Sequence, residues 1–484
     1  MLQCRHWRPT APRQLSLRNP EQNCRHTENG QLSFAKDLAE RIHAGAPKNL
    51  DEACFEWSKR AIIDTVGVAL AGAATDTARI PVRVTPVTPG PCQVIGQPIT
   101  CDPLNATLLN GTAAHALDFD DMTQNMMGHP SVAILPGLLA LGESRKSSGT
   151  QILEAYLVGF ETAGKIGRAV TYAHHDIGWH GTATLGIFAA VAAGAALMKM
   201  NAPKIATALS IAASLASGLR TNFGTMTKPL HAGHAGRNAI FALFAAEEGF
   251  SANEAAFEKK QGFFDVFLGP DTAKPDLALA AWFHPPEILD PGLCLKLYPS
   301  GAHTHPFIEM VRDLTSRHNL AASEIERIDV LSESSRHDHI NRPNPKSALD
   351  AKWSIHYLIA RTLTDGWPRL DHFTDTAVRE PKIQELMRLV HASPDPALDQ
   401  NWSDKYGGTV IITTSSGTHH RARIEHMIAR GPDNPMRDEE VESKFFDCAR
   451  RSLAQGQARE LYDALNQLSD IPDITEIMKK TRSP

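Results

Sequence analysis

Three basic side chains in this 484-residue chain precede apolar segments that have the length of helices. They are His129 before residues 132–141, His180 before residues 185–198, and Lys228 before residues 239–246. The first turn of a helix carries partial positive charge, which attracts carboxylates and disfavours the protonated form of a histidine. If the three helix starts converge, they would form a site that binds polycarboxylates and moves protons.

The segment 224–238 reads as a loop that runs into the third of these helices. Pro229 has the backbone geometry of a first helical turn, and Thr227 can cap the helix from just outside it, so we expect the helix to begin near Lys228. Three side chains add hydrogen-bond donors near this end: Lys228, His231 and Arg237. The predicted ligand is therefore an anion, either a carboxylate or a phosphate.

A structural interpretation of the same segment is also possible. The small residues in 232–236 would let another helix pack closely, and His231 or His234 could serve only as hydrogen-bonded packing residues. Lys228 differs from them, because a lysine beside a proline at the start of an apolar helix has no packing role. The functional interpretation is therefore strongest for Lys228.

Three carboxylates, Asp118, Asp120 and Asp121, come a few residues before His129. A carboxylate beside a histidine can orient the ring and change its basicity. A carboxylate–histidine metal site is the alternative. The chain has no H-E-x-x-H motif and no closely spaced set of ligands, so we predict that it binds no metal.

The composition is that of a globular protein, with 42% hydrophobic and 21% charged residues. A formal net charge of −5 argues against a nucleic-acid partner. The apolar run 186–198 is too short to span a bilayer and predicts a buried helix. The seven cysteines are scattered without a C-x-x-C pair, which predicts reduced thiols and neither a zinc site nor an iron–sulfur cluster.

The first 31 residues carry several arginines and no acidic residue before Glu21. This pattern fits a mitochondrial transit peptide or a flexible cytosolic tail. We therefore expect an intracellular protein, either cytoplasmic or mitochondrial.

Helical periodicity dominates from residue 32 to about 290, including runs at 182–200 and 252–261. Strand patterns appear only later, at 324–331 and in a hairpin over 408–425, and helical patterns return after residue 438. The predicted fold is mainly α, with a large all-α domain formed by both chain ends (32–290 and 433–484) and an inserted, smaller α+β lid domain (291–432). Residues 1–31 form a tail.

Four sequence blocks, taken in order, resemble the MmgE/PrpD family, which includes 2-methylcitrate dehydratase, cis-aconitate decarboxylase and iminodisuccinate epimerase. The blocks are 115–121 with 128–131, 178–180, 227–231, and 296–300 with 304–305. The resemblance implies an all-α domain, an α+β lid, a cleft between them, a homodimer, and neither a metal nor an organic cofactor.

The resemblance to cis-aconitate decarboxylase implies roles for single residues. It places the active-site aspartate at Asp118, two histidines at His129 and His180, and the lysine at Lys228. A threonine of the family falls near Met122 or Thr123. The residues that we assign to substrate binding are Thr123, His231, Arg237 and Tyr298.

Two positions depart from the family pattern. Gly301 stands where the decarboxylase has an active-site histidine and the dehydratase has a glutamate, and His339 stands where the decarboxylase has a tyrosine. The acid or base expected from the lid is therefore open, with His303, His305 and His339 as candidates.

The resulting prediction is a cofactor-independent lyase of a di- or tricarboxylic acid, with dehydration of a 2-methylcitrate-like substrate placed first. The alternatives are a cis-aconitate decarboxylase, an epimerase or isomerase of a dicarboxylate, and a catalytically inactive carboxylate-binding protein.

Overall fold

The computed structural model describes residues 33–86, 88–399, 406–425, 427 and 429–484. The predicted tail 1–31 lies outside the described residues. The described chain is mainly α-helical with one small mixed sheet and a two-stranded hairpin, as the sequence predicts.

Helices account for most of the chain before residue 290. They include α1 (Phe34–Ala44), α2 (Glu52–Ala73), α3 (Asp76–Val84), α4 (Pro103–His115), α5 (Pro130–Arg145), α6 (Gly149–Val170), α7 (Ala173–Ile177), α10 (Ala202–Leu215), α11 (Thr227–Glu247) and α13 (Pro275–Leu279). Ser33 caps α1 and Asp51 caps α2, each by accepting a hydrogen bond from a backbone N–H of the first turn. Between α3 and α4, strands β1 (Cys92–Gln93) and β2 (Thr100–Cys101) form an antiparallel hairpin.

The apolar stretch predicted as one helix over 182–200 is two helices, α8 (Gly181–Thr184) and α9 (Gly186–Met198), with Leu185 between them. At the break, Gly186 lies so close to α5 that a Cβ there would be 2.6 Å from the Ala133 side chain. Glycine is also less favourable than alanine inside a helix. The close contact with α5 and the low helix propensity therefore both act at Gly186, where the break occurs. Gly181–Met198 has the length and composition of a membrane span, but 89% of it is buried inside the protein.

The prediction of a helix over residues 252–261 is wrong. This segment forms turns, and the next helix is α12 (Phe263–Leu268). The backbone N–H of Phe263 donates to the Ala256 carbonyl at 2.8 Å, which folds the chain back on itself. Tertiary packing explains the difference, because the turn buries Phe257 in a cluster of aromatic rings with Phe34, Phe188, Phe263 and Phe264.

The mixed sheet has the strand order β4-β3-β5-β6. Its strands are β3 (Ile325–Ser332), β4 (Val390–Pro394), β5 (Gly408–Thr414) and β6 (His419–Ile424). The predicted strand at 324–331 and the hairpin at 408–425 are confirmed, whereas β4, which pairs with β3 in parallel, was not predicted. Helices α14 (His305–His318) and α17 (Ile355–Asp365) contribute apolar side chains to the same core as β3 and β5.

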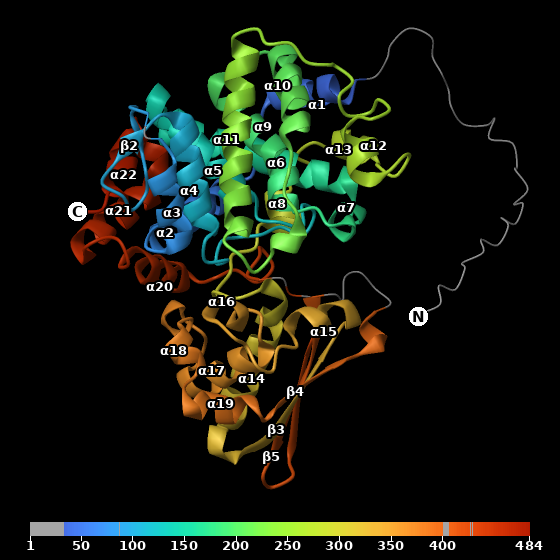
Figure 1. Cartoon of the computed structure of the whole chain (residues 1–484), viewed down its shortest axis with the longest axis vertical. Coiled ribbons are helices and arrows are strands. Elements are labelled where there is room, and N and C mark those ends of the chain that lie inside the picture. The colour runs from blue at the N-terminus through green and yellow to red at the C-terminus, as the bar shows by residue number, and fades with distance from the viewer. Residues whose placement is uncertain (1–32, 87, 400–405, 426, 428) are drawn as a thin grey trace, which may run out of the picture. The chain divides into compact units, whose positions relative to one another are not determined.

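Three helices follow the sheet segment: α20 (Asp438–Ala449), α21 (Gln455–Asn466) and α22 (Thr475–Lys480). Helices α20 and α21 pack against α2, as Figure 1 shows for α20, and α22 packs against α5. The buried ammonium group of Lys444 in α20 lies 2.5 Å from the Asp64 carboxylate in α2. Both ends of the described chain therefore contribute to one helical core, which also includes apolar residues of α21 and α22.

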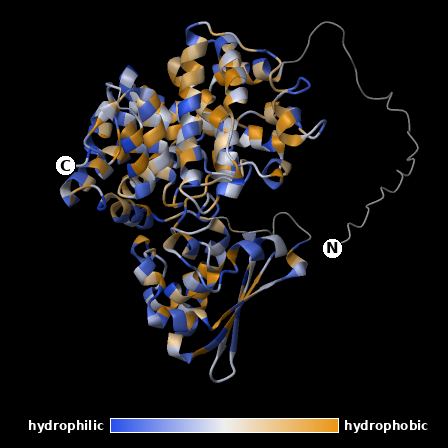
Figure 2. Cartoon of the chain, in the orientation of Figure 1, coloured by the Kyte–Doolittle hydropathy of each residue, from blue (hydrophilic) through white to orange (hydrophobic). Residues whose placement is uncertain are grey.

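Hydrophobic residues gather where the helices meet, and hydrophilic residues lie on their outward faces (Figure 2). Five cysteines lie in the described chain, and all are buried free thiols: Cys54, Cys92, Cys101, Cys294 and Cys448. This part of the chain therefore contains no disulfide, as the scattered spacing predicts.

Candidate active site

The three predicted helix starts converge on one small cavity of about 70 Å³. His129 immediately precedes α5, His180 immediately precedes α8, and Lys228 lies in the first turn of α11. Thr227 does not cap α11 from outside, because it is itself the first helical residue. The residues that line the cavity are Asp118, Met122, Met127, Gly128, His129, Tyr172, His175, His180, Phe223, Lys228, Lys296, Ala302, His303, Arg336, Trp353 and Tyr406.

Asp118 is the acidic residue of the cavity wall, and two lysines hold its carboxylate. The same oxygen, Oδ1, lies 3.0 Å from Lys228 Nζ and 2.8 Å from Lys296 Nζ. Lys296 also donates to the backbone carbonyl of Asp118 at 2.8 Å, which fixes a residue whose φ of 52° is left-handed. Burial raises the pKa of this carboxyl, but the two ammonium groups outweigh burial and hold the pKa well below its usual range, so Asp118 is ionised.

A second carboxylate, Asp120, lies beside two histidines, whereas the hydrogen bond of His129 Nδ1 goes to the Asp121 backbone carbonyl at 2.8 Å. Its Oδ2 lies 2.8 Å from His115 Nδ1 and 3.0 Å from His129 Nδ1. Burial opposes ionisation of Asp120, yet the two rings hold its pKa well below the usual range. The Nε2 atom of His129 therefore points away from Asp120, and it lies 3.6 Å from Asp118 Oδ1. His129 forms a histidine–aspartate pair beside the cavity, as the nearby carboxylates predict.

His180 presents a free nitrogen atom. Its Nδ1 lies 3.1 Å from Nδ1 of His231, and its buried Nε2 has no hydrogen-bond partner in the described structure. Burial, together with the positive charge of Lys228 nearby, lowers the pKa of His180 well below 6.5, so the ring is neutral. When its Nδ1–H donates to His231, Nε2 carries the lone pair of a base.

Other side chains come from the segment that contains the sheet. His303 and Arg336 both line the cavity, and an Arg336 Nη1–H can donate to His303 Nε2 at 3.3 Å. Burial first and then the Arg336 charge lower the pKa of His303 well below its usual range, so this ring is also neutral. Trp353 and Tyr406 complete this wall.

The remaining predicted site residues lie outside the cavity lining. Thr123 is buried and pairs through its backbone with Gly128, and the hydroxyl of Tyr298 is bound to Glu309 and Arg312. His231 lies behind His180. The others are Arg237, His305 and His339, of which His305 is fully buried against Tyr298.

Comparison with known proteins places this chain in a family. Residues 36–276 match the MmgE/PrpD N-terminal domain, and residues 298–470 match the MmgE/PrpD C-terminal domain. This chain belongs to the MmgE/PrpD family. The resemblance inferred from the four sequence blocks is thereby confirmed.

Two kinds of enzyme of the family are similar to the chain over most of its length. The cis-aconitate decarboxylase of Homo sapiens is 28% identical over 468 residues, covering 93% of this chain and 95% of the relative. The cis-aconitate decarboxylase of Aspergillus terreus is 26% identical over 458 residues, covering 89% and 92%. The 2-methylcitrate dehydratase of Cupriavidus necator is 23% identical over 391 residues, covering 75% and 79%.

The departure from the family pattern at Gly301 has a steric explanation. A Cβ on Gly301 would lie 2.5 Å from the ring of Trp353, so this backbone leaves no space for the expected histidine or glutamate. Among the three histidine candidates from residues 291–432, His303 lines the cavity, whereas His305 and His339 do not. The ring centroid of His339 lies 6.2 Å from that of His303. His303 is therefore the candidate with direct access to a bound ligand.

Four side chains could offer ligands to a metal ion, because the donor atoms of His115, Asp118, Asp120 and His129 lie within 4.8 Å of one another. Each donor group already has a partner, and two ammonium groups contact Asp118 Oδ1. Bound cations compete with a metal for that oxygen. The contacts favour an ion-pair network, and the absence of a metal stays a prediction, tested by turnover after EDTA treatment.

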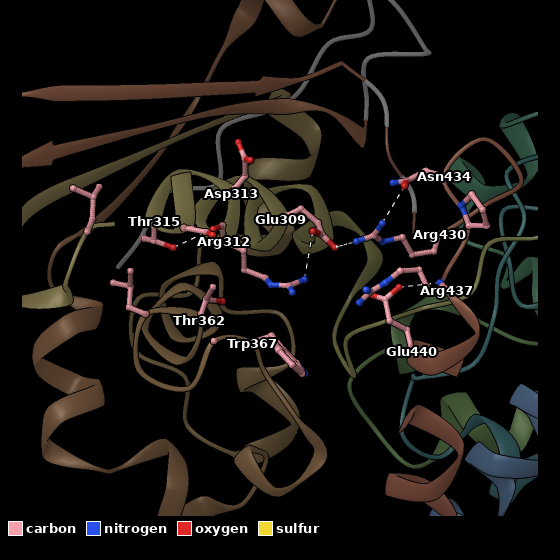
Figure 3. A pocket seen from close by; sticks show the side chains of 15 residues that line it. Glu309, Arg312, Asp313, Thr315, Thr362, Trp367, Arg430, Asn434, Arg437 and Glu440 are labelled. Carbon is pink, nitrogen blue, oxygen red and sulfur yellow. Dashed lines mark hydrogen bonds and ion pairs between the residues drawn. The ribbon is translucent and has the colours of Figure 1, made fainter. Parts of the chain in front are cut away.

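A wider cleft of about 810 Å³ is lined by α14, α17 and residues 430–440 (Figure 3). Arg430 and Arg312 lie 2.6 and 3.5 Å from carboxylate oxygens of Glu309, and Arg437 lies 3.3 Å from Glu440. No histidine or lysine is among the described residues that line it. Its size alone does not make it the site of the chemistry.

Sequence reasoning missed several residues of the cavity. Lys296 lies in the fourth family block but received no role, and Arg336, Tyr172 and Tyr406 lie in no motif. Lys352 was also missed. Its Nζ donates to the carbonyl of Leu117, beside Asp118, and to the carbonyl of Pro299, in the segment that leads to His303, so it connects these two segments. Burial lowers the pKa of Lys352 to about 7.

Proposed function

We propose that this chain is a cofactor-independent lyase that acts on a tricarboxylic acid, with decarboxylation of a cis-aconitate-like substrate placed first. The observation that carries the proposal is the cavity's charge. Lys228, Lys296 and Arg336 face only one carboxylate, Asp118, among the described lining residues, next to neutral histidines. Such a site binds polyanions and can exchange protons with them.

The sequence prediction placed dehydration first. The greater similarity to cis-aconitate decarboxylases, at 26–28% identity against 23%, leads us to place decarboxylation first. Dehydration of a 2-methylcitrate-like acid is the second candidate, since 2-methylcitrate dehydratases are also similar to the chain.

In decarboxylation, the bond between a carboxylate and its carbon breaks, and the carboxylate leaves as CO₂. The electron pair of the broken bond forms a new double bond to the neighbouring carbon. The electrons of the original double bond move to its other carbon, which takes up a proton. The lysines stabilise the negative charge that develops beside a retained carboxylate. We assign His129 as the proton donor, because it lines the cavity and its Nδ1 is engaged by the Asp121 carbonyl, which leaves Nε2 on the side of Asp118.

In dehydration, the same site would work in another order. Nε2 of His180 would take a proton from the carbon next to a carboxylate, and a hydroxyl would leave as water after receiving a proton from His303. The neutral state of His180 suits it to act as the base, whereas a neutral His303 needs a proton before it can act as the acid.

We further propose that residues 291–432 act as a lid. The cavity is smaller than the several hundred Å³ usual for ligand sites, so its walls must separate to admit a substrate. Lys352 and the His303 loop belong to this segment and would move with it. The homodimer is likewise a proposal, which light scattering of the purified protein would test.

The deciding experiment is incubation of the purified protein with cis-aconitate, 2-methylcitrate, citrate and iminodisuccinate, followed by NMR. Release of CO₂ with a new terminal methylene group supports decarboxylation, and loss of water supports dehydration. Inversion without loss of mass would identify an epimerase. Unchanged substrates, in a protein that still binds them, would identify an inactive binding protein. A parallel sample of Lys228→Ala controls for contaminating enzymes.

A further inference from the structure

Arg336 brings a buried positive charge to the cavity. It lies in the first turn of α15 (Ser334–Ile340), and only 5% of its surface is exposed. The start of this helix is fixed by Glu333, whose side chain accepts a hydrogen bond from the Arg336 backbone N–H. The guanidinium group is therefore held at the cavity wall by a capped helix.

The partners of the guanidinium group are neutral. One Nη donates to the hydroxyl of Tyr172, the other can donate to His303 Nε2, and the group stacks over the rings of Tyr172 and Tyr406 at 5.6 and 5.3 Å. The buried Nε has no hydrogen-bond partner. Among the described residues, no carboxylate lies within ion-pair distance of Arg336, whereas other buried cations such as Lys444 and Arg361 are paired.

Burying a cation without an anion is costly, because the charge loses its hydration and gains no partner. A planar guanidinium with a free N–H beside a cavity is suited to bind a carboxylate through two parallel hydrogen bonds. A carboxylate ligand would supply the missing anion.

We propose that Arg336 binds one carboxylate of the substrate, while Lys228 and Lys296 bind another. The site therefore selects acids with at least two carboxylates and favours tricarboxylates. This inference rests on the proposed function only in that the ligand is a polycarboxylate, and it adds a specificity-determining residue from the segment that contains the sheet.

The pairing also affects His303. Its ring contacts the guanidinium, and the positive charge of Arg336 disfavours protonation of the ring. A carboxylate on Arg336 would offset this charge and make the protonated ring less unfavourable. Substrate binding would thus prepare His303 to donate a proton.

Binding of tricarballylate, a saturated tricarboxylate, tests the proposal without turnover. Calorimetric titration compares the wild type with Arg336→Gln, Arg336→Lys and Arg437→Gln, alongside glutarate as the matched dicarboxylate. We expect Arg336→Gln to weaken tricarballylate binding about 10- to 100-fold, the usual effect of losing a charged hydrogen bond. Its preference for tricarballylate over glutarate should shrink. Arg336→Lys should be intermediate, because it keeps the charge but not the two parallel N–H donors of the guanidinium. Arg437→Gln, in the wider cleft, should bind tricarballylate like the wild type.

Thermal unfolding of each variant separates binding from folding, and Arg336→Lys keeps the test valid if Arg336→Gln does not fold. Wild-type affinity in a folded Arg336 variant would overturn this inference and leave the proposed function standing. Loss of binding in Arg437→Gln as large as in Arg336→Gln would place the ligand in the wider cleft and overturn it as well. Failure of the wild type to bind any of these acids would overturn both.

Discussion

The small cavity and the wide cleft both hold charged side chains, but they balance charge differently. In the cleft, three arginines face three acidic residues, Glu309, Asp313 and Glu440. In the cavity, three cations face Asp118 alone among the described lining residues. The cleft is about 810 Å³ and the cavity about 70 Å³, so the larger space is the one whose positive and negative side chains balance.

This difference shows that volume is a poor guide to function here. Paired charges on a surface contribute little and need no ligand. An excess of buried positive charge destabilises the fold until an anion pairs with it. Neutral histidines with unpartnered nitrogen atoms strengthen the contrast, because they are found at the cavity and not in the cleft.

The largest expected effect comes from removing a cavity cation. Lys228→Ala should lower kcat/KM about 30- to 1000-fold, because a hydrogen-bonded charge contributes roughly 2–4 kcal/mol of transition-state stabilisation. The melting temperature should change little, since Lys296 still pairs with Asp118. Near-normal turnover, or activity lost only in step with the melting temperature, would show that Lys228 is structural.

A pair of histidines sharpens the comparison within one neighbourhood. His180→Ala should cost a factor similar to that of Lys228→Ala, because it removes a cavity-lining ring whose Nε2 has no hydrogen-bond partner in the described structure. His234→Ala should cost less than about 3-fold, because His234 is exposed on α11 and does not line the cavity. Steady-state kinetics of both variants test this, and equal losses would contradict the assignment of His180.

Low pH should destabilise the folded protein through the buried side chain of His174. Burial lowers the pKa of His174 from 6.5 to about 4, so the unfolded chain binds a proton between pH 6.5 and 4 that the folded chain does not. His174 therefore costs stability as the pH falls through this window. His174→Phe should gain about 2–3 kcal/mol relative to the wild type between pH 7 and 4. Urea unfolding at several pH values measures this gain, and parallel curves would contradict it.

The smallest effect is expected in the wide cleft. Arg437→Gln removes an exposed ion pair with Glu440, so the free energy of unfolding should change by less than about 0.5 kcal/mol and kcat/KM by less than about 2-fold. Kinetics and urea unfolding measure both quantities. A loss of activity as large as that of Lys228→Ala would break the comparison and move the active site to the cleft.

Much of the fold could be predicted from local patterns. Helical periodicity located the helical region of the first 290 residues, and strand patterns located β3 and the β5–β6 hairpin. The failures were positions where long-range contacts decide the conformation, as in the turn that buries Phe257 and the close approach of Gly186 to α5. The assignment of residues 291–432 as a lid stays a prediction.

For the candidate site, the sequence by itself determined which helices begin with a base: α5, α8 and α11. Each start depends on neighbouring residues only, so it can be read from the chain. Only the tertiary structure decided that these starts meet, that Lys296 reaches Asp118 across 178 residues, and that Trp353 fills the space beside Gly301. Arg336 stayed hidden for the same physical reason, since an unpaired buried charge is a property of three-dimensional surroundings and leaves no periodic pattern in the sequence.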